Sequence, residues 1–203
     1  MGFEGNVNRN GSKSFNASHG DIKNDKMSEI EGNQFIKNFL SIIKTYTKGA
    51  YYICFYRLGL HFLFKAMQSL NIEYKSIIIW DKGNHTLSNS DYMSKYEPIV
   101  YGWISEHKFF GKPEFDIWDV KRTTKNELHP TMKPIELCTR AIKNSSQRGD
   151  IVLDLFGGSG STLMAANELK RICFIMELDP KYCDVIRKRY AQSIGKGEEW
   201  QNL

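Results

Sequence analysis

Apolar residues follow two different spacings along the chain. Helical spacing, with apolar positions three or four residues apart, runs over residues 31–47, 58–70, 134–145, 161–169 and 180–190. Short continuous apolar runs, which are typical of buried strands, cover residues 50–56, 74–80, 96–103, 116–120, 150–156 and 171–178. Because these strands alternate with helices, we expect a mostly parallel, doubly wound α/β sheet.

The two ends of the chain lack such patterns. Residues 1–30 are rich in Asn, Gly, Ser and Lys, a composition typical of a mobile loop or tail. Residues 195–203 are expected to be frayed. Residues 31–194 therefore remain as one folded domain, and a chain of 203 residues is long enough to bury a sizeable core.

Composition narrows the classes of protein only modestly. The 28 Lys and Arg residues exceed the 23 acids by five charges, which permits a nucleic-acid partner without requiring one. The longest apolar runs, such as residues 77–80, are too short to cross a membrane, and the polar N-terminus has no signal-peptide pattern. The four cysteines occur singly, without the spacing of zinc or redox sites. We therefore expect reduced thiols, no metal and a cytoplasmic location.

The stretch "VLDLFGGSGST", residues 152–162, points to a ligand. It reads as a strand, a glycine turn and the start of a helix, and ligands of open α/β sheets bind at the carboxyl ends of strands. Glycines there allow the backbone to approach a ligand directly. The next strand ends in Glu177, an acid that can accept both hydroxyls of a ribose. The pair of turns therefore predicts a nucleoside site, against the alternative of a tight turn with a surface acid.

Asp154 helps to distinguish two classes of nucleotide. A dinucleotide site places a pyrophosphate at the helix N-terminus, where this acid, three residues before the first glycine, would repel it. The same charge suits the ammonium and sulfonium groups of S-adenosylmethionine. The sequence thus favours S-adenosylmethionine, and an oxidoreductase that binds NAD in a Rossmann-type fold stays as an alternative.

Three motifs in order carry a resemblance to a known family. They are "HPTMKPIEL" from His129, "RGDIVLDLFGGSGST" from Arg148 and "ELDPKYCDVIRKRY" from Glu177. This series resembles the amino-methylating DNA methyltransferases, which modify adenine N6 or cytosine N4. The match is close over residues 129–190 and looser back to about residue 31. The glycine motif lies near the C-terminus, and in this motif order the chain resembles the circularly permuted beta subgroup of the family.

The resemblance implies a set of S-adenosylmethionine contacts. Glu177 would hold the ribose, Leu178 would flank the adenine, and the segment before the third helix would lie near the methionine part. The implied cofactor-binding residues are Asp154, Phe156, Gly157, Gly158, Ser159, Gly160, Thr162, Glu177, Leu178, Thr131 and Lys133. Thr131 and Lys133 also have an alternative as capping and surface residues, and Asp179 is expected to be a helix N-cap.

The chain departs from the family at the catalytic motif. The family uses Asp-Pro-Pro-Tyr or Ser-Pro-Pro-Tyr to hold a flipped-out base, and this chain contains no Pro-Pro pair. No catalytic residue is therefore assigned. We expect the chain to start downstream of its catalytic strand, which would lie centrally between residues 50–56 and 150–156, so that two inner edges are unpaired. A divergent motif within residues 1–30 is the alternative.

DNA contacts are expected in two loops, residues 81–95 and 104–128. Both contain basic side chains with interleaved aromatic residues, which suit phosphate contact and base stacking. The alternative is a solvated loop whose aromatic residues reach the core. The predicted DNA-contacting residues are Lys82, His85, Lys108, Lys112 and Arg122.

These features predict a site-specific DNA methyltransferase of a restriction-modification type, incomplete as this chain stands. Adenine N6 is favoured as the methylated atom, with cytosine N4 as the alternative. A noncatalytic subunit that binds S-adenosylmethionine or DNA is a third possibility. Its catalytic strand would come from a second chain, whereas an upstream segment would supply that strand in a truncated enzyme.

Overall fold

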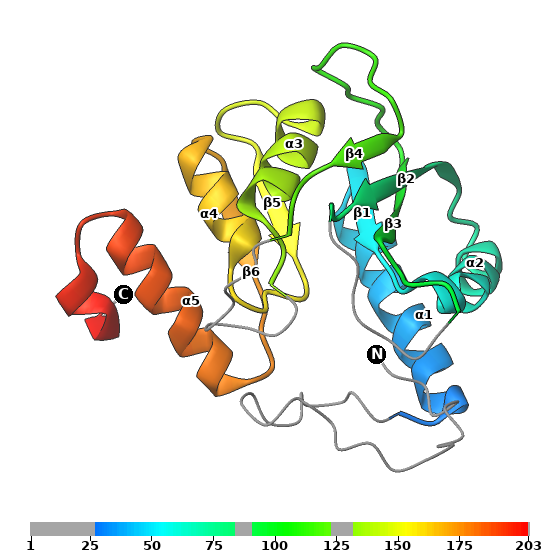
Figure 1. Ribbon diagram of the computed structural model, residues 1–203, viewed down its shortest axis with the longest axis horizontal. Coiled ribbons are helices and arrows are strands. Elements are labelled where there is room, and N and C mark those ends of the chain that lie inside the picture. Colours follow the sequence, from blue (N-terminus) through cyan, green and yellow to red (C-terminus); the bar gives the residue numbers. More distant parts are fainter. Residues whose placement is uncertain (1–26, 84–90, 123–131, 203) are drawn as a thin grey trace.

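The computed structural model describes residues 27–83, 91–122 and 132–202 (Figure 1). Six strands and five α-helices are assigned in these residues, together with two short 3₁₀ helices. Their bounds are α1 Glu29–Tyr46, β1 Ala50–Cys54, η1 Arg57–Gly59, α2 Leu60–Ser69, β2 Tyr74–Asp81, β3 Tyr96–Trp103, β4 Ile117–Asp119, α3 Ile135–Ser145, β5 Ile151–Asp154, α4 Ser161–Glu168, β6 Ile172–Ile175, α5 Pro180–Ser193 and η2 Gly197–Asn202.

The strands form two sheets. A four-stranded sheet has the order β1-β3-β2-β4, and a second sheet consists of β5 and β6. The pairs β5–β6 and β2–β4 are parallel, whereas β3 runs antiparallel to both β1 and β2. The sequence predicted a loop between β2 and β3, which suits an antiparallel return because parallel neighbours usually need a helical crossover.

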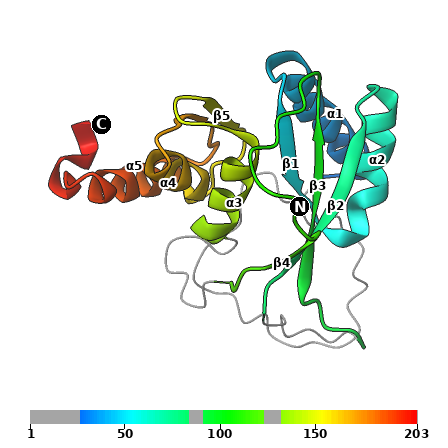
Figure 2. The same ribbon diagram turned by 90° about the horizontal axis from the view of Figure 1, so that it is seen from above.

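Helices cover both faces of the four-stranded sheet, which confirms the doubly wound α/β arrangement (Figure 2). On one face, Ile36 and Leu40 of α1 and Leu63 of α2 pack against Tyr51 and Ile53 of β1. The opposite face carries a second core with α3. Its buried members are Ile78, Trp80, Ile99, Trp118, Val120 and Leu137.

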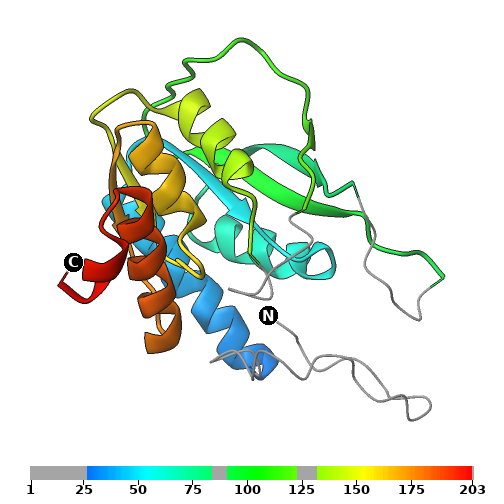
Figure 3. The ribbon, with the colours of Figure 1, turned by 60° about the vertical axis from the view of Figure 1, so that its left-hand side comes forward.

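Helices α1 and α3 each contact both sheets from opposite sides (Figure 3). Residue Leu155, directly after β5, packs against the core that α1 forms with β1. On the other side, Ile142 of α3 packs with Val152 of β5, and Ser145 at the end of α3 shares a 2.8 Å hydrogen bond with Tyr52 of β1. The two sheets therefore belong to one layer between α1 and α3, although no described strand joins β1 to β5.

Local sequence explains where two of the helices begin. Ser28 accepts a hydrogen bond from the backbone of Glu31, and the Glu31 carboxylate accepts one from the Ser28 N–H, which is a capping box. Asp179 caps α5 by accepting from the N–H of Lys181, so its expected role as an N-cap is confirmed. Both caps satisfy backbone donors that the first turn leaves unpaired.

Some predictions differ from the structure in detail. The helix predicted over residues 134–145 begins at Ile135, and Pro134 is its N-cap residue. The end of the chain, expected to be frayed, forms η2, and Trp200 lies under the cations of Arg187 and Lys188. Residues 1–26 of the predicted mobile segment lie outside the described residues. None of the helices in the described ranges is both long and apolar enough to cross a membrane.

Candidate functional site

The glycine turn, residues 157–160, joins the end of β5 to the first turn of α4. Gly158 and Gly160 have φ angles of 53° and 82°, a region that side chains disfavour. A Cβ atom on Gly157 would lie 2.8 Å from Cγ1 of Ile175, at the end of β6. The turn thus needs glycine for its own conformation and packing, in addition to any approach of a ligand.

Glu177 follows β6 and reaches back to the glycine turn. Its Oε2 accepts a hydrogen bond of 2.7 Å from the Gly158 N–H, and its Oε1 accepts one of 2.8 Å from the Asp179 N–H. Each carboxylate oxygen can accept a further hydrogen bond, so the acid is still able to bind a hydroxyl. The turns after β5 and β6 are therefore held together as one unit.

Asp154 and Phe156 mark the end of β5. The Asp154 Oδ1 accepts a hydrogen bond of 2.9 Å from the Phe156 N–H, which fixes the carboxylate at the strand end. Phe156 is 54% exposed, and its ring packs on Phe35 and Phe39 of α1, with centroid distances of 5.8 and 5.5 Å. An acid and an accessible aromatic ring thus flank the glycine turn, and Leu178 beyond Glu177 is also exposed.

The first turn of α4 is anchored by several polar contacts. The Ser161 hydroxyl donates a 2.7 Å hydrogen bond to the backbone carbonyl of Lys133, which ties the segment before α3 to this turn. Ser159 is buried and its carbonyl accepts a hydrogen bond from Arg189 of α5. Thr162 donates to the sulfur of Cys138 at 3.8 Å. Lys133, Ser159 and Thr162 therefore lie at one helix end, and their role in cofactor binding stays a prediction.

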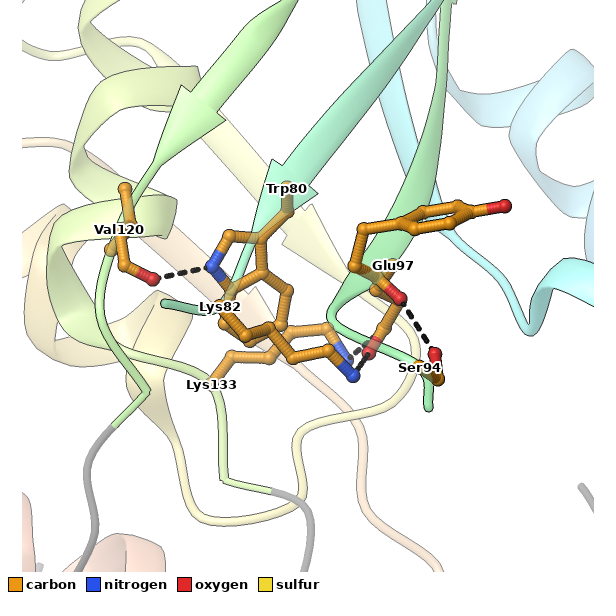
Figure 4. A network of polar contacts seen from close by, with 7 residues as sticks. Trp80, Lys82, Ser94, Glu97, Val120 and Lys133 are labelled. Atoms are coloured by element: carbon orange, nitrogen blue, oxygen red, sulfur yellow. Dashed lines mark hydrogen bonds and ion pairs between the residues drawn. The ribbon is translucent and has the colours of Figure 1, made fainter. Parts of the chain in front are cut away.

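A polar network links this region to the four-stranded sheet (Figure 4). Glu97 of β3 lies between two lysines, with its Oε1 3.3 Å from Lys133 Nζ and its Oε2 3.7 Å from Lys82 Nζ. Burial alone would lower the pKa of Lys133, but Cys54 and Glu97 outweigh it and the pKa is raised. Sequence reasoning missed Glu97, since only the pairing of distant segments brings it to the lysines.

The predicted DNA-contacting residues have different environments. Lys82 is only 15% exposed and is engaged with Glu97, so contact with a phosphate would require this pair to open. Lys108 is exposed and forms an ion pair of 2.8 Å with Glu106, whereas Lys112 is exposed. The Arg122 N–H donates to the Lys82 carbonyl. Their role in DNA binding stays a prediction, and His85 and Thr131 lie outside the described residues.

Comparison with known proteins identifies relatives of one kind. Residues 102–188 match the family model described as DNA methylase, of the N6/N4 type. The chain is 27% identical over 146 residues to Type II methyltransferase M2.MboI of Moraxella bovis, covering 63% of this chain and 54% of that protein. It is 33% identical over 116 residues to Type II methyltransferase M.BglI of Bacillus subtilis, covering 57% of this chain and 30% of that protein. The chain thus spans about half or less of these relatives.

Solved structures share the fold. The complex of M1.HpyAVI with SAM superposes with a TM-score of 0.66 at 23% identity, covering 79% of this chain and 82% of that one. The cytosine-N4-specific PvuII DNA methyltransferase gives a TM-score of 0.67 at 15% identity, covering 86% and 79%. These likenesses confirm the predicted fold. The match of residues 102–188 supports the resemblance to the amino-methylating DNA methyltransferases, whereas the beta subgroup and the missing catalytic motif stay predictions.

Proposed function

We propose that this chain, a relative of the DNA amino-methyltransferases, binds S-adenosylmethionine at the turns after β5 and β6. In the protein to which it contributes, the bound methyl group is transferred to an exocyclic amino group of a DNA base. The observation that carries the proposal is the hydrogen bond between Glu177 and the Gly158 N–H, which sets a hydroxyl-accepting acid beside the glycine turn.

The residues at the site suit the chemistry of S-adenosylmethionine. The Glu177 carboxylate keeps capacity to accept hydrogen bonds from ribose hydroxyls. Asp154 at the strand end suits a cationic methionine part and disfavours a pyrophosphate. The exposed side chains of Phe156 and Leu178 offer apolar surface to an adenine ring. The cofactor supplies an electrophilic methyl group on its sulfonium when bound.

Lys133 contributes a different charge. Its ammonium is held by Glu97, and its backbone carbonyl is held by Ser161 at the first turn of α4. This double anchoring keeps a cation near the methionine end of the proposed site, where it suits a carboxylate. The positive charge is retained because the pKa of Lys133 is raised.

The base that accepts the methyl group is proposed to be adenine at N6, with cytosine at N4 as the alternative. Such chemistry requires a base out of the duplex and groups that accept from its amino nitrogen. We infer that these groups come from a segment outside the described residues, on an upstream part of the protein or on a second chain. A noncatalytic subunit that binds the cofactor is the alternative role for this chain.

Calorimetric titration of the chain with S-adenosylmethionine and with NAD tests the cofactor. We expect the chain to bind S-adenosylmethionine and not NAD. Glu177→Ala removes one charged hydrogen-bond acceptor, so it should weaken S-adenosylmethionine binding by about 1.5–3 kcal/mol, or roughly 10- to 150-fold. Glu168→Ala, an exposed acid at the end of α4, is the matched control and should bind normally. Binding of NAD alone would favour the oxidoreductase alternative and overturn the proposal.

The methylated base is tested on the complete protein. Nucleoside mass spectrometry of DNA from cells that carry the full gene should detect N6-methyladenine. Detection of N4-methylcytosine alone would replace adenine by cytosine, and detection of neither product would favour the noncatalytic subunit. Mapping the methylated positions tests the short or relaxed target that we propose from the shortness of the two predicted DNA-contact loops, residues 81–95 and 104–128. A long unique target would contradict it.

A further inference from the structure

Helix α5 packs beside α4 and contacts the glycine turn (Figure 3). Ile186 and Arg189 are three residues apart and therefore lie on the same side of α5. Ile186 is buried, and Cβ atoms on Gly157 and Gly160 would lie 3.1 and 3.2 Å from its side chain. Arg189 donates a hydrogen bond to the carbonyl of Ser159, in the middle of the turn. The helix after the second βα turn thus contacts the first one.

The hydrogen bond from Arg189 fixes one peptide group of the turn. The Ser159 carbonyl belongs to the same peptide group as the Gly160 N–H, and this N–H donates a hydrogen bond of 2.7 Å to the Gly157 carbonyl. In a planar trans peptide the carbonyl and the N–H point in opposite directions, so the two hydrogen bonds together set the orientation of the group. Because Ser159 is buried, loss of the arginine would leave its carbonyl without a replacement partner.

The glycines of the turn make such external contacts important. Gly158 and Gly160 have positive φ angles, and glycine loses more backbone freedom on ordering than any other residue. Glu177, directly after β6, already accepts from the Gly158 N–H. Glu177 and Arg189 therefore hold two different peptide groups of the turn, one on each side of the peptide that joins Gly158 to Ser159.

The charge of Arg189 strengthens its contact with the turn. The side chain is half-buried, and this burial lowers the pKa of its guanidinium. It still remains charged at neutral pH, because arginine is not deprotonated in proteins. A hydrogen bond from a charged donor is roughly twice as strong as one between neutral groups. Arg189 can therefore restrict a flexible turn more effectively than a neutral side chain could.

We propose that Arg189 is a positioning residue for the cofactor, because its guanidinium holds the Ser159–Gly160 peptide group in the orientation that bound S-adenosylmethionine requires. This inference rests on the proposed function, in which the same turn binds the cofactor. Without the guanidinium the turn adopts further orientations, and the apparent affinity falls in proportion to the competent fraction. A tenfold loss corresponds to a turn that is competent roughly one tenth of the time.

Calorimetric titration of Arg189→Met with S-adenosylmethionine tests the positioning role. Methionine keeps an unbranched side chain and removes the charged donor. We expect its Kd to rise roughly tenfold or more above the wild-type value, measured well below the melting temperature of each chain. Arg189→Lys keeps a charge and a donor, so its Kd should lie between the two. Equal Kd values for Arg189→Met and the wild-type chain would overturn the proposal.

Arg187→Met is the matched control on the same helix. Arg187 also donates to a backbone carbonyl, that of Gln201, at 2.6 Å. This carbonyl belongs to η2 and not to the glycine turn, so Arg187→Met removes the same type of hydrogen bond elsewhere on α5. It should bind S-adenosylmethionine like the wild-type chain. Equal weakening by Arg187→Met and Arg189→Met would overturn the proposal in favour of a general loosening of α5.

Hydrogen exchange followed by NMR separates positioning from stability, without any ligand. In Arg189→Met the Gly160 amide should shift its resonance and exchange on the order of tenfold faster, because its peptide group is no longer fixed. The Met164 amide, which donates within α4, and the Ile172 amide, which donates to the Asp150 carbonyl, should keep their rates. Equal acceleration of all three amides would show a general loss of stability and overturn the positioning role.

The two proposals fail in different ways. Absence of S-adenosylmethionine binding by the wild-type chain would refute the proposed function and the cofactor role of Arg189 together, whatever the Gly160 amide shows. Binding by the wild-type chain with an unchanged Kd in Arg189→Met would refute only the positioning role. A raised Kd together with a local response of the Gly160 amide supports both.

Discussion

Replacement of Gly157 by alanine isolates the packing of the glycine turn from its backbone conformation. Unlike Gly158 and Gly160, Gly157 is not among the residues with positive φ, so an alanine there meets a steric conflict only. The added Cβ would lie 2.8 Å from Cγ1 and 2.9 Å from Cδ1 of Ile175, and 3.1 Å from Cδ1 of Ile186. Contacts below 3.0 Å cannot be kept, so the Ile175 side chain, β6 or the turn must shift.

The cost follows from overpacking of a close-packed site. Forcing one methyl group into such a site costs about 1–3 kcal/mol. For a chain of this size each kcal/mol lowers the melting temperature by roughly 2–4 °C. Ile175→Ala removes both atoms that Cβ would meet below 3.0 Å, so in that background the added cost of Gly157→Ala should fall below about 1 kcal/mol. The same shift should weaken cofactor binding, because the Gly158 N–H that Glu177 holds moves with the turn.

Thermal and urea unfolding of the four chains of this double-mutant cycle gives the coupling between the two positions. Gly49→Ala is the matched control, since nothing lies within 4 Å of a Cβ at that position, and its stability should stay within about 0.5 kcal/mol of the wild-type value. Equal stability of Gly157→Ala and Gly49→Ala would refute the steric argument. If Gly157→Ala lowers the free energy of unfolding equally with and without Ile175→Ala, the steric conflict does not arise from Ile175.

Two further predictions concern the cap of α1 and a buried thiol. Ser28→Ala should cost about 1 kcal/mol at neutral pH by removing the capping box, seen as a lower melting temperature. Hydrogen bonds from Ser28 lower the pKa of Glu31 below its ordinary value of 4.5, so their contribution is present above that pH and lost as the pH falls through the folded pKa. The difference between the two chains should therefore shrink in acid, and a constant difference would contradict the role of Glu31. Burial raises the pKa of the Cys54 thiol to about 12. Alkylation of Cys54 by iodoacetamide at pH 8, followed by peptide mass spectrometry, should therefore be far slower in the folded chain than in the unfolded one. Equal rates in the two states would contradict burial of the thiol.

Much of the local structure was readable from neighbouring residues. The period of apolar positions predicted α1 to α5 and all six strands, because amphipathic helices and buried strands differ in spacing over a few residues. Asp179 before Pro180 is a local cap signal, and it is confirmed as the N-cap. The glycine motif with Glu177 was likewise visible, since each βα turn lies within a short stretch of sequence.

The tertiary structure decided the relations between distant segments. The antiparallel placement of β3 between β1 and β2 brings Glu97 to Lys82 and Lys133, which no local pattern indicates. The steric need for Gly157 arises from Ile175 on another strand, and Lys82 is partly buried where it pairs with Glu97. Sequence alone predicted the residue types of a cofactor site and the two unpaired inner edges. The register of β1 on β3 and of β5 on β6 depended on strand pairing, because register and neighbours follow from the path of the whole chain and not from any one segment.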